Sequence, residues 1–338
     1  MSLLFKSQKK IFLELNNLIK RHPAMAVFVC HEYFRNLCPY DPYIKFKHSN
    51  PVKRIIETQK KILDLFKVLK KFENYKILFN NDQFVKKFHN YSEQNKDIYF
   101  KKNFQFNEVK KNLLKRFKSV KFDLKKGIKN KIVLDAGCGP GRFTYILSSF
   151  KPKKIYGVDL LKDNIQIAKR VFKNKNVKYY QGNVLKLPHK NNTFDFVYSS
   201  GVVHHTQNMK KGIDELFRVC KDGGYIYLYA YGRGGLYWAA RKTMNKLMKK
   251  IPQHFTQSFL NMMGMPSNRL FFLDNWYVSH EDHTYTKDLI KILKKYKPKK
   301  IQKVVSGVKY DYQTGIEKYK KLGKLIWGDG DLRYLIKK

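Results

Sequence analysis

Residues 132–143 read IVLDAGCGPGRF. The first four residues predict a short apolar strand that ends in Asp135, and the residues after Gly141 predict the beginning of a helix. Three alternating glycines, Gly137, Gly139 and Gly141, lie between the two elements. Glycine adopts positive φ freely and lets a backbone approach a ligand closely. The stretch therefore predicts a ligand-binding turn at the carboxyl end of a strand.

Strands and helices alternate after this turn, which is typical of a parallel sheet covered by helices on both faces. The predicted strands are Ile132–Asp135, Ile155–Asp159, Val177–Gln181, Phe194–Ser199, Tyr225–Tyr231, Lys300–Val305 and Leu332–Ile336. The predicted helices are Arg142–Phe150, Lys162–Phe172, Lys210–Cys220 and Thr286–Tyr296, and we expect Asp222–Gly224 to cap the third. The fold class is thus α/β, a Rossmann-like, doubly wound, seven-stranded and mostly parallel sheet.

Two further regions lie outside this alternation. Residues 1–90 predict a lysine-rich helical N-terminal region, in which Asn50-Pro51 begins an amphipathic helix whose apolar stripe includes Ile55 and Ile56. Residues 236–285 predict a helical insertion after the fifth strand, and insertions of this size are often lids. We therefore expect a helical region at 1–90 and a ligand-binding domain at 91–338 that contains the insertion.

The composition describes a globular chain of 338 residues, of which 43% are hydrophobic. The sequence has no apolar run long enough to span a bilayer and no signal-peptide pattern at its beginning, so we expect a cytoplasmic protein. The four cysteines lack the spacing of a zinc site. We expect reduced thiols and no metal.

The formal net charge of +44 raises the question of a polyanionic partner. Residues 1–130 carry 30 basic and 11 acidic residues, against 40 and 15 in the rest, so no single basic arm stands out. Only 11 of the 70 basic residues are arginine, the residue that phosphate recognition prefers. A general enrichment in lysine is the favoured explanation, while contact with RNA or with an anionic membrane surface stays open.

The glycine spacing is GxGxG, not the GxGxxG of dinucleotide sites, and it suits a ligand with a smaller anionic end such as an amino-acid carboxylate. Asp135 would face the cation of that amino acid. Asp159 follows Gly141 by 18 residues, close to the spacing of a carboxylate that binds ribose hydroxyls. Asn183 follows the third strand, where an adenine edge can dock. An amino acid, a ribose and an adenine together describe S-adenosylmethionine.

Several motifs in order resemble the class I S-adenosylmethionine-dependent methyltransferases, and most of all the small-molecule group that includes the ubiquinone and menaquinone methyltransferases. These motifs are Val133–Phe143, Gly157–Leu160, Gly182–Pro188, Phe194–His205 and Leu216–Gly224. The resemblance covers Gly127–Tyr231 well and the last 50 residues loosely. It does not cover residues 1–90 or Leu236–Tyr285.

The resemblance implies that the chain is an enzyme whose cofactor is S-adenosylmethionine. The cofactor-binding residues that it implies are Asp135, Gly137, Cys138, Gly139, Gly141, Asp159, Leu160, Asn183, Val184, Ser199 and Ser200. Asn183 stands where an aspartate is common in the family. His204 and His205 follow the fourth strand and are the candidates for a general base. The alternative is that they cap a helix or pack against the cofactor.

The leading prediction for the acceptor is an O, N or C atom of a small or lipid-linked metabolite. The insertion would then line an apolar pocket with Trp238, Phe255, Phe259, Met262, Met263, Phe271, Phe272, Trp276 and Tyr277, unless these residues are ordinary core. An RNA acceptor is the alternative, and a non-catalytic relative of the fold is a third reading. The motifs that position a base amine or a cytosine nucleophile are missing, which disfavours DNA. No obligate protein partner is predicted.

Overall fold

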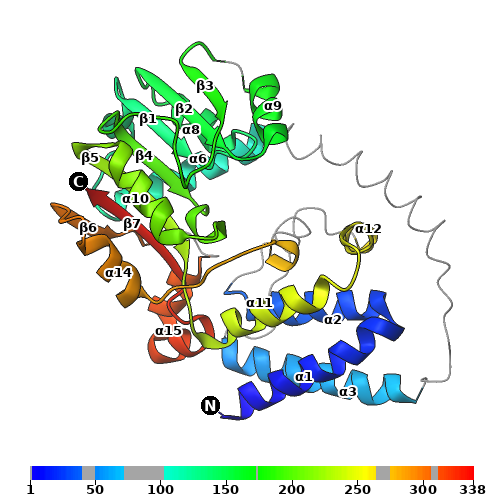
Figure 1. Cartoon of the computed structure of the whole chain (residues 1–338). Coiled ribbons are helices and arrows are strands. Elements are labelled where there is room, and N and C mark those ends of the chain that lie inside the picture. The colour runs from blue at the N-terminus through cyan, green and yellow to red at the C-terminus, as the bar shows by residue number, and fades with distance from the viewer. Residues whose placement is uncertain (1, 40–49, 72–102, 173, 264–274, 306–310) are drawn as a thin grey trace. The chain divides into compact units, whose positions relative to one another are not determined.

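The computed structural model describes residues 2–39, 50–71, 103–172, 174–263, 275–305 and 311–338. By its packing the chain divides into two compact units (Figure 1). The helical unit comprises Met1–Lys102, Gly234–Ser279 and Gly315–Gly328; the sheet unit comprises Asn103–Arg233, His280–Thr314 and Asp329–Lys338. Most of the predicted insertion therefore packs with the N-terminal helices.

The sheet unit is built on seven strands in the order β3-β2-β1-β4-β5-β7-β6 (Figure 1). Neighbours among β1 to β5 are parallel, and β7 is antiparallel to both β5 and β6. The strands are β1 Ile132–Ala136, β2 Lys154–Asp159, β3 Val177–Gln181, β4 Phe194–Ser200, β5 Cys220–Tyr231, β6 Lys300–Lys303 and β7 Asp331–Lys337. The predicted fold class is confirmed. Because chain order reverses between β1 and β4, a crevice is expected at their carboxyl ends.

Helices cover both faces of this sheet because its strands alternate apolar side chains between two hydrophobic clusters. Val133 and Phe196 pack in one cluster with the helices α6, α7 and α8, and Leu134 and Val197 pack in the other with α10 and α14. The helices of the sheet unit are α6 Asn103–Lys118, α7 Leu124–Ile128, α8 Arg142–Ser148, α9 Lys162–Val171, α10 Met209–Val219 and α14 Thr286–Lys294.

The predicted glycine cap after the third helix is wrong. Helix α10 ends at Val219, and β5 begins at the next residue, Cys220. Gly223 has a φ of 76°, and its amide donates to the carbonyl of Lys338, the last residue. The positive φ of Gly223 thus lets β5 bend near its start, and the bend brings the Gly223 amide to the carbonyl of Lys338. The strand predicted at Lys300–Val305 ends at Lys303.

The helical unit contains α1 Ser2–Arg21, α2 Pro23–Leu37, α3 Pro51–Lys70, α11 Gly235–Met248 and α12 Gln253–Met262. The predicted start of α3 is confirmed: the Asn50 Oδ1 accepts from the amides of Val52 and Lys53 at 2.9 and 3.3 Å. Ile55 is buried as predicted, whereas Ile56 is exposed. Among the described residues, no helix is long and apolar enough to cross a membrane.

Two tryptophans fix the centre of the helical unit. The Trp327 Nε1 donates to the carbonyl of Leu37 at 2.7 Å, and the Trp238 Nε1 donates to the carbonyl of Trp327 at 3.0 Å. Trp327 ends α15, Tyr312–Trp327, a helix with a break at Lys320 that the sequence analysis missed. Buried indoles with bonded N–H groups fix the helices that carry them.

Candidate active site

The glycine loop, residues 137–141, joins β1 to α8. The amides of Gly137 and Cys138 donate to the carbonyl of Val158 at 2.8 and 2.9 Å and hold the loop against β2. Gly137 has a φ of 81°, and a Cβ there would lie 2.4 Å from the Val202 side chain. Gly139 also has positive φ, but a Cβ there would meet none of the described residues within 4 Å. A ligand can therefore approach the backbone at Gly139.

The other residues of this loop have structural roles. Gly141 is the N-cap of α8, and a Cβ there would press on Ala168 at 2.9 Å. Cys138 is buried, and burial raises the pKa of its thiol. A protonated, buried thiol is a weak ligand group, so the loop offers a ligand the backbone of Cys138.

Asp135 lies next to the end of β1 and is buried. Its Oδ2 accepts from the Thr144 Oγ1 at 2.6 Å. Burial raises the pKa of Asp135 to about 7, the Thr144 bond lowers it, and the charge of Asp159 raises it. A cation that binds beside a buried carboxyl stabilises the charged form of that carboxyl. A site with such a carboxyl and no cationic partner therefore favours a cationic ligand.

Asp159 ends β2 and shapes the glycine loop. Its Oδ2 accepts from the amide of Gly139 at 2.9 Å, and its Oδ1 accepts from Leu161 N and Asn164 Nδ2, each at 3.0 Å. A carboxylate has about four lone-pair positions, and these contacts use three. Asp159 therefore holds the loop open and keeps acceptor capacity for a hydroxyl.

The ends of β2 and β3 are neighbours in the sheet, since Asp159 pairs with Gln181. Leu160 is exposed, as is Asn183. The Asn183 Oδ1 accepts from the amide of Leu185 at 2.9 Å, so its side chain keeps its NH2 group for a ligand. The Val184 side chain belongs to the core.

The predicted serines lie at the end of β4. Ser199 is fully buried, and its Oγ has no hydrogen-bond partner within the described chain. Ser200 is half-buried and pairs with Tyr229 of β5. Ser199 thus has a buried hydroxyl without a described partner, whereas the side chain of Val184 is part of the core.

His204 and His205 form a short 3-10 turn after β4, Val203–His205. His204 is fully buried, and its ring centroid lies 3.8 Å from that of Tyr231. His205 is half-buried, and its Nδ1 lies 2.9 Å from the carbonyl oxygen of His280. Since a carbonyl only accepts, Nδ1 carries the proton, and the basic lone pair of neutral His205 is on Nε2.

The segment 280–284 crosses the carboxyl ends of β4 and β5. It lies at the end of the predicted lid insertion, but the sequence analysis named none of its residues as site residues. The Asp282 amide donates to the carbonyl of His204 at 2.6 Å, and the Thr284 amide donates to that of Tyr231 at 3.2 Å. The side chains of His283 and Glu281 pair at 3.0 Å. The two histidines that the sequence analysis selected are therefore positioned by backbone bonds from a distant segment.

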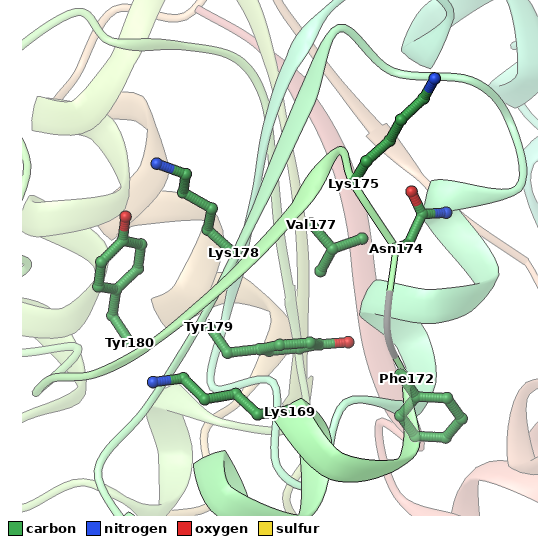
Figure 2. A pocket seen from close by; sticks show the side chains of 8 residues that line it. All are labelled: Lys169, Phe172, Asn174, Lys175, Val177, Lys178, Tyr179 and Tyr180. Atoms are coloured by element: carbon green, nitrogen blue, oxygen red, sulfur yellow. The ribbon is translucent and has the colours of Figure 1, made fainter.

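A cavity of about 610 Å³ lies along β3, the edge strand. Figure 2 shows Lys178 and Tyr180 on one side of β3 and Val177 and Tyr179 on the other. Lys169, Lys175 and Lys178 line the cavity, and no acidic residue does. Its chemistry is that of a basic surface, distinct from the strand-end acids.

A family model described as "Methyltransferase domain" matches residues 134–228, the part of the sheet unit that carries both strand-end acids and the glycine loop. The chain contains a class I S-adenosylmethionine-dependent methyltransferase domain. The predicted resemblance is confirmed at this level, and the family implies S-adenosylmethionine as methyl donor.

Curated relatives of this methyltransferase domain differ in the acceptor that their names give. Demethylmenaquinone methyltransferase of Lactococcus lactis is 35% identical over 99 residues, which are 28% of this chain and 39% of that protein. Norajmaline N-methyltransferase of Rauvolfia serpentina is 29% identical over 152 residues, 43% of this chain and 51% of that protein. The chain thus spans about half or less of these relatives' lengths, and they do not determine its acceptor.

Among solved structures, the domain is similar to a Haloferax volcanii protein in complex with the Trm112 methyltransferase activator. That likeness has a TM-score of 0.43 and 14% identity, and it covers 68% of this chain and 93% of the other.

The residues of the methyltransferase domain fit its donor. The open space at Gly139 admits a ligand against the backbone, Asp135 lacks a cationic partner in the described structure, and Asp159 retains acceptor capacity. These three groups lie at the ends of adjacent strands β1 and β2. Gly139 suits an amino-acid tail, Asp135 suits its ammonium group, and Asp159 suits a ribose hydroxyl.

Proposed function

We propose that this chain transfers a methyl group from S-adenosylmethionine to a small or lipid-linked metabolite. The observation that supports it best is the pair of strand-end acids on either side of an open glycine loop, within the matched domain. The bound donor would supply an electrophilic methyl group. The chain would bind the donor, orient it and exclude water, which together account for most of the rate in such a reaction.

Within this proposal each acid has one task. Asp135 pairs with the donor's ammonium group, and Asp159 accepts from a ribose hydroxyl while it keeps Gly139 in place. The Asn183 NH2 and the exposed Leu160 side chain receive the adenine. The loop backbone around Gly139 receives the amino-acid tail.

We assign the role of general base to His205 in preference to His204. The His280 carbonyl fixes the proton on Nδ1 of His205, so Nε2 is the ring nitrogen that would take a proton from a hydroxyl or amine acceptor. His204 is fully buried against Tyr231, which suits a packing role. A base of this kind contributes roughly 10²-fold to 10⁴-fold in rate.

The acceptor class is supported by a relative whose name gives demethylmenaquinone as its substrate, a molecule of the lipid-linked type. The lid predicted for residues 236–285 stays a proposal. Trp238 and Trp276 are buried in the helical unit, which agrees with the alternative that they are ordinary core residues. Phe271 and Phe272 lie outside the described residues.

A second candidate function, methylation of RNA, is favoured by the cavity along β3. Three lysines line it, and Tyr180 is exposed on the same side of β3 as Lys178 (Figure 2). Lysines bind phosphates and tyrosine rings stack on bases, so this surface suits a single-stranded RNA.

The test uses methyl-labelled S-adenosylmethionine with a total lipid extract and, separately, with total RNA. The proposal expects label in solvent-extracted lipid or small metabolites, and about 10²-fold less label with His205→Asn. His280→Ala is the matched control, because it keeps the backbone carbonyl that bonds His205 and should retain activity. Label only in RNA would replace the acceptor class, and no label anywhere despite donor binding would favour a non-catalytic relative of the fold.

A further inference from the structure

Helix α1 exposes apolar side chains to an unusual degree. Among the large hydrophobic residues that the structure describes, the two most exposed are Leu3, at 69%, and Leu13, at 62%. Phe5, on the same helix, is 38% exposed. Moving exposed apolar surface of this kind out of water lowers the free energy.

These three residues share one broad face of α1. At about 100° per residue, Leu3, Phe5 and Leu13 lie within an arc of about 160°, opposite the buried Leu15 and Ile11. Lys6, Lys9 and Lys10 fall within the same arc and are exposed. We call the six residues Leu3, Phe5, Lys6, Lys9, Lys10 and Leu13 the α1 face.

The charge of the α1 face is uncompensated. Helix α1 has a single acidic residue, Glu14, and its carboxylate pairs with Lys70 of α3 at 2.9 Å. None of the three lysines of the face forms a salt bridge with a described residue. The face therefore mixes apolar and cationic side chains with no anion of its own.

A groove continues the apolar surface from α1 onto α11. It has a volume of about 460 Å³ and is lined by Phe5, Phe12, Leu13 and Lys9 of α1 and by Ala239 and Thr243 of α11, among others. Both helices belong to the helical unit. The exposed surface is thus wider than one helix.

The composition of the α1 face separates three kinds of partner. RNA would use the lysines but not the leucines, since aliphatic side chains cannot stack on bases as aromatic ones do. A second copy of the chain in a symmetric dimer would bring the lysines of the two copies together without acids between them. An anionic bilayer uses both, because apolar side chains enter the headgroup region while lysines reach lipid phosphates.

We propose that α1 docks this chain along the surface of an anionic lipid bilayer, with Leu3, Phe5 and Leu13 in the headgroup region and Lys6, Lys9 and Lys10 at the phosphates. The helix lies on the membrane and does not cross it. Docking itself does not depend on methyl transfer. Its consequence, access to a lipid-linked acceptor, rests on the proposed function.

The test is co-sedimentation of the full chain with phosphatidylcholine vesicles that contain or lack phosphatidylglycerol. We expect binding to the anionic vesicles only. The double variant Leu3→Ser/Leu13→Ser should weaken that binding about tenfold or more, since it removes both exposed leucines. Lys6→Gln/Lys9→Gln/Lys10→Gln should remove the preference for the anionic vesicles.

Ile56→Ser/Val68→Ser is the matched control, because these α3 side chains of the same unit are 45% and 49% exposed and lie outside the α1 face. It should bind vesicles as the wild type does. S-adenosylmethionine binding is measured for every variant and should not change, which separates failed docking from a failed donor site. The proposal is overturned if the wild type does not bind anionic vesicles. It is also overturned if the leucine variant binds as the control does, or if RNA displaces the vesicles from the wild type.

Discussion

Asp135 is the titrating residue of the proposed donor site. Burial raises its pKa to about 7, and the charge of Asp159 adds to the rise while the Thr144 bond opposes it. Because the folded-state pKa lies above the unfolded value, Asp135 favours folding at pH values below the unfolded pKa, and this contribution is lost as pH rises through about 7. A cationic ligand group binds the ionised carboxylate, so donor binding releases a proton below that pH.

The affinity for S-adenosylmethionine should therefore depend on pH. We expect the Kd to fall by close to tenfold per pH unit on approach to about 7 and then to level off. Asp135→Asn should bind more weakly with a flat profile over that range. Titration calorimetry in buffers of different ionisation enthalpy counts the released proton, and a wild-type Kd that stays constant below pH 7 would contradict the assignment.

Two glycines of the loop should respond differently to the same substitution. Gly137→Ala forces a Cβ to within 2.4 Å of Val202, at a positive φ, and should lower the free energy of unfolding by about 2 kcal/mol or more. Gly139→Ala meets open space and should cost about 1 kcal/mol, yet weaken donor binding because the methyl group fills the ligand's place. Denaturant unfolding and calorimetry measure both quantities. Equal losses of stability in the two variants would contradict the packing described.

At the level of single residues, a position at the end of a strand is enough to select a side chain as a site candidate. Asp135 and Asp159 were predicted in this way. The bond from the Gly139 amide to Asp159 and the one from His205 to the His280 carbonyl join residues 20 and 75 positions apart. No local pattern encodes such contacts, so the loop-shaping role of Asp159 and the tautomer of His205 required the structure.

At the scale of elements, local signals are reliable where one residue type has one common use. Asn50 before Pro51 predicts the start of α3, and the structure has that cap. Glycine is more ambiguous: Gly223 fits a helix cap or a bent strand. In α15, Gly315 and Gly323 weaken the helical pattern, although a Cβ at Gly315 would lie 2.6 Å from the Trp327 ring. Packing, not propensity, selects glycine there.

The α3 cap gives a quantitative prediction for this scale. Asn50→Ala removes an acceptor for two helix amides and should lower the free energy of unfolding of the helical unit by about 1 kcal/mol. Asn50→Ser keeps a capping oxygen and should cost only a few tenths of that amount. Thermal unfolding of the two variants measures the difference. If both lose the same stability, the cap is not what stabilises α3.

At the scale of the whole molecule, the chain returns twice to its N-terminal helices. Residues 234–279 and 315–328 pack with them, and the segments between complete the sheet unit. Sequence patterns describe the sheet unit well because β1 to β5 and their helices follow one another along the chain. They cannot show which unit a later helix joins, since that depends on long-range packing.

The fold, the matched domain and the strand-end acids support one central claim, that this chain binds S-adenosylmethionine between Asp135, the glycine loop and Asp159. Titration calorimetry of the donor with the wild type and with Asp159→Ala tests it most directly. We expect the wild type to bind and Asp159→Ala, which loses both a hydroxyl acceptor and the partner of the Gly139 amide, to bind at least tenfold more weakly. Equal affinities for the two proteins, or no binding by the wild type, would contradict it.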